Sequence, residues 1–316
     1  MSALRHTVLV TGATGLIGRH LLPLLIGQAE VIAVSRFARR APGGVRWIAC
    51  DLAKPGAGLG LVTSVRPDVV IHLAGSVRGD RSLDAVSPTL STNLVLGVEL
   101  LEAATRAGCR RIVFSGSLLE EPAAEGGFPV PPSPYGASRW AASAYARMFH
   151  ALFDSPVVIL RPSYAYGPGQ DRSKLIPHTI NALLEGRSPR LGSGKRRLDC
   201  VYAADVARAF HRAASAEGVE GQTIDLGSGS SRSVRSIVEL ISKLVGPTPG
   251  RPAFDALPSR PLEQELAVDA ERAAETLGWR ATTGLEDGLR ATLDWFRESG
   301  SAPGSRYDAA AASTRD

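Results

Sequence analysis

Three glycines near the start of the chain have the spacing of a phosphate-binding turn. Gly12, Gly15 and Gly18 follow the strand-like residues 8–11 and precede an apolar helical pattern, which predicts a buried strand turning tightly into a helix. Glycine adopts the backbone angles that such a turn requires, and it has no Cβ to block a diphosphate from the main chain. The N–H groups and positive dipole at the helix start then bind that diphosphate. We therefore expect a nucleotide to bind at Gly12, Thr14, Gly15, Leu16, Ile17 and Gly18.

The end of the second predicted strand, residues 30–35, indicates which dinucleotide binds. In this kind of fold an acidic residue at that position accepts a hydrogen bond from the free 2′-hydroxyl of the adenosine ribose. This chain has Arg36 there, followed by Arg39 and Arg40. A guanidinium binds a 2′-phosphate through charge-assisted hydrogen bonds and gains little from a hydroxyl. The sequence therefore favours NADP(H) over NAD(H), and a solvated basic loop is the alternative interpretation.

Groups suited to proton transfer follow later in the chain. The strand predicted over residues 110–117 delivers the hydroxyls of Ser115 and Ser117 to its carboxyl end. Tyr135 and Arg139 then begin an apolar helix, and because they are four residues apart they share one helical face. The sequence thus predicts two hydroxyls at a strand end, and a phenol and a cation on one face of the following helix.

Other polar residues have two readings. Asp51, at the end of the strand predicted over residues 45–52, either accepts a hydrogen bond from an adenine amino group or caps the following turn. His72, inside the strand predicted over residues 67–75, is interpreted as a packed histidine rather than a catalyst. Asn93 lies among leucines and valines in the helix predicted over residues 87–107, and it needs hydrogen-bond partners if it is buried.

The order of the elements predicts the architecture. Strands and helices alternate up to about residue 165, which indicates an α/β fold with a doubly wound parallel sheet covered on both faces. Beyond that point short amphipathic helices alternate with loops rich in glycine and proline, near residues 173–186, 203–215, 233–245, 269–277 and 284–298. We expect a dinucleotide-binding domain over residues 1–165. Residues 166–298 form a smaller, mixed, mainly substrate-binding lobe with segments returning to the core, and residues 299–316 form a disordered tail.

Bulk composition narrows the partners and the compartment. The 316 residues are 44% hydrophobic and 21% charged, and their net charge of +5 includes no basic run typical of nucleic-acid binding. The three cysteines lack a metal-ligand spacing, so we expect no metal and a reducing compartment. No stretch is apolar enough to cross a bilayer and no leader is apparent. We expect a cytoplasmic protein that binds a small molecule, without a nucleic-acid or membrane partner.

Several motifs occur in one order and with consistent gaps. Besides the glycine turn they are Asp51-Leu52, residues 72–75, Asn93, residues 115–117, Tyr135-x-x-x-Arg139, residues 160–170, residues 197–206, Arg260-Pro261 and residues 277–279. Together they resemble the extended short-chain dehydrogenase/reductases, the NAD(P)-dependent nucleotide-sugar epimerase/dehydratase family. The resemblance spans residues 7–298, which is far more specific than any single motif.

The resemblance implies roles for individual residues. Ser117 would donate a hydrogen bond to the reacting oxygen of the substrate, and Tyr135 would be the general acid and base. The cofactor would also be contacted by Asp51, Leu52, Leu73, Ala74, Gly75, Asn93, Tyr135, Arg139, Arg161 and Pro162. The substrate would be contacted by Ser117, Tyr135, Tyr164, Arg197 and Arg260, the two arginines pairing with its diphosphate. The helices predicted over residues 87–107 and 134–150 would pair in a homodimer.

These residue types suit reversible hydride transfer. Hydride delivered to a carbonyl carbon leaves an alkoxide, so a phenol that is ready to donate a proton lowers the barrier. A neighbouring cation favours the phenolate form. The chain departs from the family here, because the usual lysine is Arg139. Arginine keeps the charge, but its planar fork does not simply replace an ammonium. A second departure is Tyr164, where the family usually has an asparagine that contacts the substrate phosphates.

The resemblance also narrows the reaction. Dehydratases of this family have an Asp-Glu pair after the catalytic hydroxyl, whereas this chain has Leu118 and Leu119, and the cysteine of 3,5-epimerising members is absent after Ser117. Reduction at one carbon and 4-epimerisation remain. Because Arg36 favours NADP(H), a dissociable reductant, the sequence favours an NADPH-dependent ketoreductase that reduces a nucleoside-diphosphate 4-keto-6-deoxyhexose at C4. An NAD(P)-dependent nucleotide-sugar 4-epimerase is the first alternative. A cofactor-binding protein whose catalysis is weakened by Arg139 is the second.

Overall fold

The computed structural model describes residues 6–39, 43–77, 81–120, 130–258, 262–263 and 265–300. Its centre is a seven-stranded sheet of order β3-β2-β1-β4-β5-β6-β9 in which every strand pair is parallel. The strands are β1 Thr7–Thr11, β2 Glu30–Ser35, β3 Val45–Ala49, β4 Val69–His72, β5 Arg111–Ser115, β6 Val157–Pro162 and β9 Thr223–Leu226. This is the predicted doubly wound parallel sheet, and the α/β fold class is confirmed.

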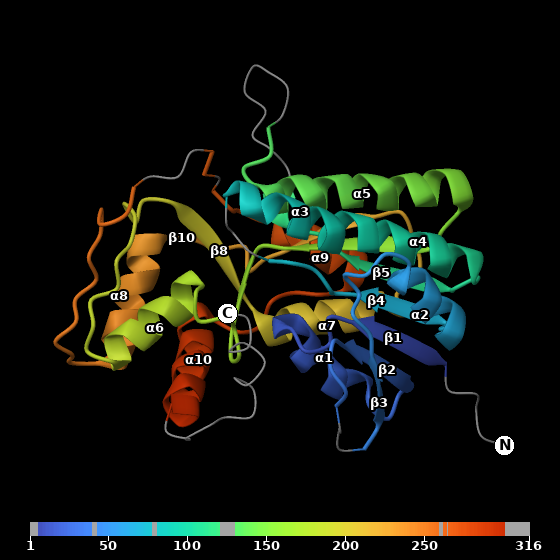
Figure 1. Ribbon diagram of the computed structural model, residues 1–316. Coiled ribbons are helices and arrows are strands. Elements are labelled where there is room, and N and C mark those ends of the chain that lie inside the picture. The colour runs from blue at the N-terminus through green and yellow to red at the C-terminus, as the bar shows by residue number, and fades with distance from the viewer. Residues whose placement is uncertain are drawn as a thin grey trace.

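Both faces of this sheet are covered by helices, and the residues of its inner strands β2, β1, β4, β5 and β6 are accordingly nearly all buried. One face packs against helices α1 (Leu16–Leu25), α7 (Ala203–Ala213) and α9 (Ala270–Leu277). The opposite face packs against α2 (Ala57–Val65), α4 (Leu96–Arg106) and α5 (Pro134–Phe153). Figure 1 shows α4 and α5 along the upper side of the sheet and α1 beside α7 along the lower side.

A smaller lobe lies at one end of the molecule, on the left in Figure 1. It contains a three-stranded mixed sheet of order β10-β8-β7, with β7 at Tyr164–Tyr166, β8 at Arg197–Tyr202 and β10 at Ser231–Ser233. Helices α6 (Leu175–Leu184), α8 (Val234–Val245) and α10 (Leu285–Gly300) pack with these strands around a separate apolar core. The smaller lobe with mixed structure is therefore present as expected.

The sequence located the five later helices to within a few residues but missed strands β7, β8, β9 and β10. Strands β7 and β10 have only three residues each, too short for a reliable alternation of polar and apolar side chains. Strand β9 joins the large sheet as its seventh strand and α7 packs against α1, so both segments return to the main core. Helix α10 runs through Gly300, and residues 301–316 of the predicted tail lie outside the described residues.

The long helix predicted over residues 87–107 is interrupted. It consists of α3 (Val86–Thr89), a π-helical segment at Leu90–Val95 (η2) and α4. The π-helical segment carries Asn93, which is fully buried. Such local widening of a helix is frequent at functional sites. No helix among the described residues is both long enough and apolar enough to span a bilayer.

Candidate active site

The glycine turn lies where the strand order of the large sheet reverses, between β1 and β4. In open α/β sheets ligands bind beyond the carboxyl ends of the strands at this point. Gly12 has a φ of +66°, and a Cβ there would lie 2.5 Å from the backbone nitrogen of Ala74. Gly18 packs equally closely, because its Cβ would lie 2.5 Å from the Gly12 oxygen. Gly15 is exposed at the start of α1, and no side chain caps that helix.

The loop that follows β4 is fastened to β1 by Thr11. The Thr11 hydroxyl accepts a hydrogen bond from the Ala74 amide at 3.3 Å and lies 2.8 Å from Nδ1 of His72. Burial, helped by the nearby Arg139 charge, lowers the pKa of His72 to about 3. His72 is therefore a neutral, packed side chain, in agreement with its interpretation from the sequence. The predicted cofactor residues Leu73, Ala74 and Gly75 are held next to the glycine turn.

Asn93 connects this loop to helix α5. Its Oδ1 accepts a hydrogen bond from the Ser76 amide at 2.7 Å, and its Nδ2 donates to the Ser76 oxygen at 3.1 Å. The same Nδ2 donates to the Ser138 hydroxyl at 3.0 Å. The buried amide thus has the partners that its position requires, and it fixes the loop against the helix that carries Tyr135.

Arg139 is buried, with only 1% of its surface exposed. Its Nη1 donates a hydrogen bond to the backbone oxygen of Ser115 at 2.7 Å. Its guanidinium carbon lies 5.8 Å from the centre of the Tyr135 ring. A Cβ at Gly75 would collide with both Nη2 of Arg139 and Oδ1 of Asn93. Arg139 therefore lies beside the Tyr135 ring and against the loop that follows β4.

Ser117 follows β5 and is 7% exposed. Its Oγ accepts a hydrogen bond from the Leu119 amide at 3.2 Å, and its own amide donates to Oε1 of Glu120 at 2.6 Å. A Cβ at Gly136 would lie 2.6 Å from the Leu119 oxygen, so the segment after Ser117 presses on the first turn of α5. That turn carries Tyr135, which is partly buried. These contacts bring the predicted catalytic residues Ser117, Tyr135 and Arg139 together.

Sequence reasoning missed Glu120. It ends the short 3-10 helix Leu118–Glu120 (η3) and is completely buried. Burial raises the pKa of Glu120 to about 7, although the Ser143 hydroxyl, the Ser117 amide and the charges of Arg161 and Arg139 all oppose that rise. The available signal was two acidic residues after two leucines that follow a buried strand, a pattern that equally fits a solvated turn.

Two predicted cofactor contacts have structural partners of their own. The guanidinium of Arg161 pairs with Asp225 on β9, with Nε 2.6 Å from Oδ1 and Nη2 2.9 Å from Oδ2. Oδ1 of Asp51 accepts a hydrogen bond from the Ala53 amide at 3.2 Å, the turn-capping contact that was one of its two readings. Leu52 is partly buried and Pro162 is buried at the carboxyl end of β6. The roles of these four residues toward a cofactor stay predictions.

The basic segment after β2 lies at the surface. Arg36 and Arg39 are exposed, and their guanidinium carbons lie 5.9 Å and 5.7 Å from the ring centres of Phe37 and Trp47 respectively. Ser35, at the end of β2, donates its hydroxyl hydrogen to the Phe37 oxygen. Arg40 lies outside the described residues.

The structure describes two of the three substrate residues predicted in the smaller lobe, Tyr164 and Arg197. Tyr164 is partly buried, and burial raises its pKa, which keeps the phenol protonated. Arg197 is exposed, and its Nη2 donates to the Ser231 oxygen at 2.5 Å, which links β8 to β10. Its neighbour Arg196 lies 3.6 Å from Glu263. Arg260 lies outside the described residues.

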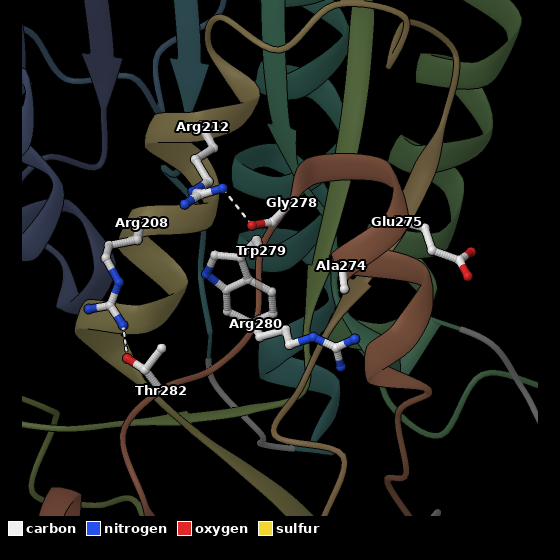
Figure 2. Close-up of a pocket in the computed structure, with 8 residues that line it drawn as sticks. All are labelled: Arg208, Arg212, Ala274, Glu275, Gly278, Trp279, Arg280 and Thr282. Atoms are coloured by element: carbon white, nitrogen blue, oxygen red, sulfur yellow. Dashed lines mark hydrogen bonds between the residues drawn. The ribbon is translucent and has the colours of Figure 1, made fainter.

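A separate cavity of about 510 Å³ contains none of the predicted site residues. It is lined by Arg208, Arg212, Ala274, Glu275, Gly278, Trp279, Arg280 and Thr282 (Figure 2). Arg280 pairs with Glu271, and Nη1 of Arg212 donates to the backbone oxygen of Gly278 at 2.5 Å. These contacts occupy the guanidinium groups of both side chains.

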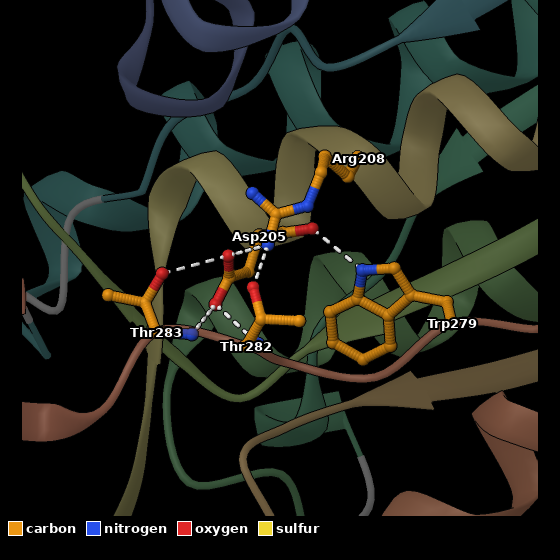
Figure 3. A network of polar contacts seen from close by, with 5 residues as sticks. All are labelled: Asp205, Arg208, Trp279, Thr282 and Thr283. Atoms are coloured by element: carbon orange, nitrogen blue, oxygen red, sulfur yellow. Dashed lines mark hydrogen bonds and ion pairs between the residues drawn. The ribbon is translucent and has the colours of Figure 1, made fainter.

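Beside this cavity a buried carboxylate joins two segments that are distant in the sequence. Oδ2 of Asp205 accepts hydrogen bonds from the amides of Thr282 at 3.1 Å and Thr283 at 2.9 Å, and Arg208 pairs with Oδ1 (Figure 3). The Trp279 indole donates to the backbone oxygen of Asp205 at 2.8 Å. The network fixes α7 to residues 279–283, so it serves the fold.

Comparison with known proteins gives consistent results. Residues 8–227 match the NAD dependent epimerase/dehydratase family. The chain is 31% identical over 310 residues to a UDP-glucose 4-epimerase of Mycolicibacterium smegmatis, covering 92% of this chain and 98% of that protein. The structure of MoeE5 in complex with UDP-glucose and NAD is 32% identical, with a TM-score of 0.82 and coverage of 93% and 100%. That of Thermus thermophilus UDP-glucose 4-epimerase in complex with NAD is 27% identical, with a TM-score of 0.81 and coverage of 94% and 100%.

Proposed function

The chain belongs to the NAD dependent epimerase/dehydratase family, and from that premise we propose that it is a nucleotide-sugar 4-epimerase acting at C4 of a nucleotide-linked hexose. The family makes it an enzyme of the oxidoreductase type. The observation that carries the proposal is the contact between Arg139 and both Ser115 and Tyr135, next to Ser117. The similar proteins named above include 4-epimerases of UDP-glucose and structures with bound NAD.

The residues at the strand ends fit a nicotinamide dinucleotide. Gly12 and Gly18 have no room for a Cβ. Helix α1 follows the exposed Gly15, and it has no side-chain cap and no acidic residue in its first turn. The backbone there would hold the diphosphate. When bound, the nicotinamide supplies the hydride chemistry. Asn93 and Gly75 fix the loop that would border it, and Arg139 contributes the positive charge of the site.

The chain's own residues account for the proton transfers. Tyr135 would accept the proton of the C4 hydroxyl while C4 is oxidised to a ketone, and would return a proton to the same oxygen when C4 is reduced from its opposite face. Ser117 would donate its hydroxyl hydrogen to the same sugar oxygen. The guanidinium of Arg139, whose carbon lies 5.8 Å from the centre of the Tyr135 ring, would be the positive charge beside the phenol during these transfers.

Dehydration does not suit this site. Leu118 and Leu119 occupy the two positions after Ser117, and neither side chain transfers a proton. The next residue, Glu120, is buried and bound to the Ser117 amide, so its carboxylate faces the protein interior. The proposed chemistry is therefore confined to one carbon, which both 4-epimerisation and 4-reduction satisfy.

A second candidate is the NADPH-dependent 4-ketoreductase favoured by the sequence, acting on a nucleoside-diphosphate 4-keto-6-deoxyhexose. The observation that favours it is the pair of exposed guanidinium groups, Arg36 and Arg39, just beyond β2. An exposed guanidinium at that position suits the 2′-phosphate of NADP(H). Such a reductase would use NADPH as a dissociable substrate rather than as a retained cofactor.

We also propose a homodimer formed by α3, η2, α4 and α5. Along these helices Val86, Leu90, Val95 and Tyr145 each expose more than 40% of their surface (44%, 46%, 43% and 43%). Apolar side chains grouped on neighbouring helices are typical of interfaces.

The three cysteines are free, which suits the proposed reducing, cytoplasmic location.

One assay separates these candidates. The purified protein is incubated with UDP-glucose without added cofactor, and the sugar configuration at C4 is followed by NMR. Interconversion with the C4 epimer that is lost in Tyr135→Phe supports the epimerase. Stoichiometric oxidation of NADPH with a nucleotide 4-keto-6-deoxyhexose, without interconversion, supports the ketoreductase instead. Cofactor binding without turnover of either substrate would leave the catalytically weakened protein.

A further inference from the structure

Glu120 is an ionisable side chain with no exposed surface. Glutamate is almost never fully buried unless it is paired, because removing a carboxylate from water is costly. The proposed reaction gives Glu120 no part in proton transfer. Its position next to Ser117 therefore needs an explanation of its own.

The contacts of Glu120 fix the backbone of Ser117 from both sides. Oε1 of Glu120 accepts the hydrogen of the Ser117 amide at 2.6 Å, and the Glu120 amide donates to the Ser117 oxygen at 3.1 Å. Between them the Leu119 amide donates to the Ser117 hydroxyl oxygen at 3.2 Å. One turn of chain thus holds the amide, the carbonyl and the hydroxyl of Ser117 at once.

The carboxylate has little room to move. A Cβ at Gly116 would lie 2.5 Å from Oε1 of Glu120 and 2.9 Å from Cγ of Arg161, so glycine there lets the carboxylate approach the strand end. On the opposite side the Leu119 oxygen presses on Gly136, next to Tyr135. A displacement of η3 would therefore change how Ser117 and Tyr135 lie relative to each other.

We propose that Glu120 is a positioning residue for Ser117: its buried side chain accepts the Ser117 amide hydrogen and fixes the backbone that aims the Ser117 hydroxyl at the substrate. The aim of that hydroxyl rests on the function proposed above, whereas the hydrogen bond does not. Glu120 itself does not contact the substrate, and it acts only through Ser117.

The groups that face Glu120 determine when it is ionised. Helix α5 contributes the Arg139 charge and the Ser143 hydroxyl, and β6 contributes Arg161, which is itself paired with Asp225 of β9. All three neighbours favour the carboxylate, but burial outweighs them and brings its pKa to about 7. A carboxylate accepts a stronger hydrogen bond than the neutral acid, so the hold on Ser117 strengthens as Glu120 ionises.

The hydrogen bond is tested without any substrate. Protein labelled with ¹⁵N-serine is titrated from pH 5 to pH 8, and the amide signal of Ser117 is followed. We expect that signal to move downfield as pH rises, to stay constant in Glu120→Gln, and to titrate at higher pH in Ser143→Ala, which lacks a hydroxyl that favours the carboxylate. A Ser117 amide that responds alike in wild type and Glu120→Gln overturns the proposal.

Kinetics test the consequence for Ser117. Glutamine keeps a side-chain oxygen that accepts the hydrogen bond from the Ser117 amide. Valine has a side chain of similar width but no hydrogen-bond acceptor. We expect Glu120→Val to lower kcat by about tenfold or more with an unchanged cofactor Kd, and Glu120→Gln to recover most of that loss. Wild-type kcat in Glu120→Val overturns the positioning role while leaving the proposed function intact. Absence of turnover in wild type, together with a Ser117 signal that follows Glu120, contradicts the function and leaves the hydrogen bond standing.

Discussion

Nη1 of Arg139 donates to the backbone oxygen of Ser115 at 2.7 Å, so helix α5 is joined to the end of β5 by the only cation beside the Tyr135 ring in the described part of the chain. The bond explains how an arginine is accommodated where the family usually has lysine. The guanidinium is anchored to the strand end and lies against Gly75, so the charge stays fixed near the phenol although the head group is larger.

We expect Arg139→Lys to keep turnover within about tenfold, because the charge remains, and to lose about 1–3 kcal/mol of stability, because the Ser115 oxygen loses a buried donor. Arg139→Met removes the charge and should lower kcat by about 100-fold or more. Steady-state kinetics and urea unfolding measure both effects. An inactive wild-type protein that is activated by Arg139→Lys would instead identify arginine as the cause of a weakened enzyme.

Arg36 is expected to discriminate between the two dinucleotides. Arg36→Ala removes the proposed charge-assisted hydrogen bonds to the 2′-phosphate, so the KM for NADPH should rise by about 10- to 100-fold while that for NADH changes by less than about twofold. The matched control is Arg46→Ala, an exposed arginine on the adjacent β3 that lies 4.0 Å from Glu30. Equal effects of Arg36→Ala on both cofactors would contradict a preference for NADP(H).

The proposed dimer predicts a mass change from two surface substitutions. Leu90→Glu combined with Tyr145→Glu places charges on the exposed faces of η2 and α5, so sedimentation should detect a monomer instead of a dimer. Leu257→Glu is the control, because Leu257 is 42% exposed but lies outside these helices. If wild type and the double variant sediment alike, this face is no dimer interface.

Asp205 is predicted to matter for stability and not for cofactor binding. Asp205→Ala leaves the amides of Thr282 and Thr283 without their acceptor, which should cost about 3–5 kcal/mol of unfolding free energy. Asp294→Ala, which removes an exposed ion pair with Arg297 at 3.4 Å, should cost less than about 1 kcal/mol. Urea unfolding compares the two, and a weakened cofactor Kd in Asp205→Ala would show that the network reaches the active site.

Local patterns in the sequence were sufficient for six strands of the large sheet but not for its seventh strand, β9, nor for every contact. Strands such as β2 and β4 contain continuous apolar runs, and Gly12, Gly15 and Gly18 mark the first turn, so these features are visible without tertiary information. Strands β7 and β10 were invisible because three residues show no period.

Glu120 is the clearest case of a residue whose role depends on tertiary structure. Its neighbours in the sequence are two leucines before it and a further acidic residue after it, which predicts nothing about burial. Its burial arises because Gly116, Ser143 on α5 and Arg161 on β6 surround it from three separate elements. A periodic pattern along the sequence does not predict which distant segments pack together.

That burial also predicts how stability depends on pH. The pKa of Glu120 rises from 4.5 to about 7 on folding, so between these values the folded protein binds more protons than the unfolded chain. The stabilising contribution is fully present below the unfolded pKa and is lost as pH rises through the folded one. A shift of this size corresponds to an upper limit of roughly 3 kcal/mol.

We therefore expect wild type to lose unfolding free energy relative to Glu120→Gln as pH rises from 4.5 to 7.5, because glutamine does not ionise. Urea unfolding at several pH values measures this difference. Glu102→Gln is the control, since Glu102 is half-exposed in an ion pair with Arg106 and should change stability by less than about 1 kcal/mol throughout. Parallel curves for wild type and Glu120→Gln would mean that Glu120 ionises in the folded protein as it does in water, and that its carboxylate is not held in the interior.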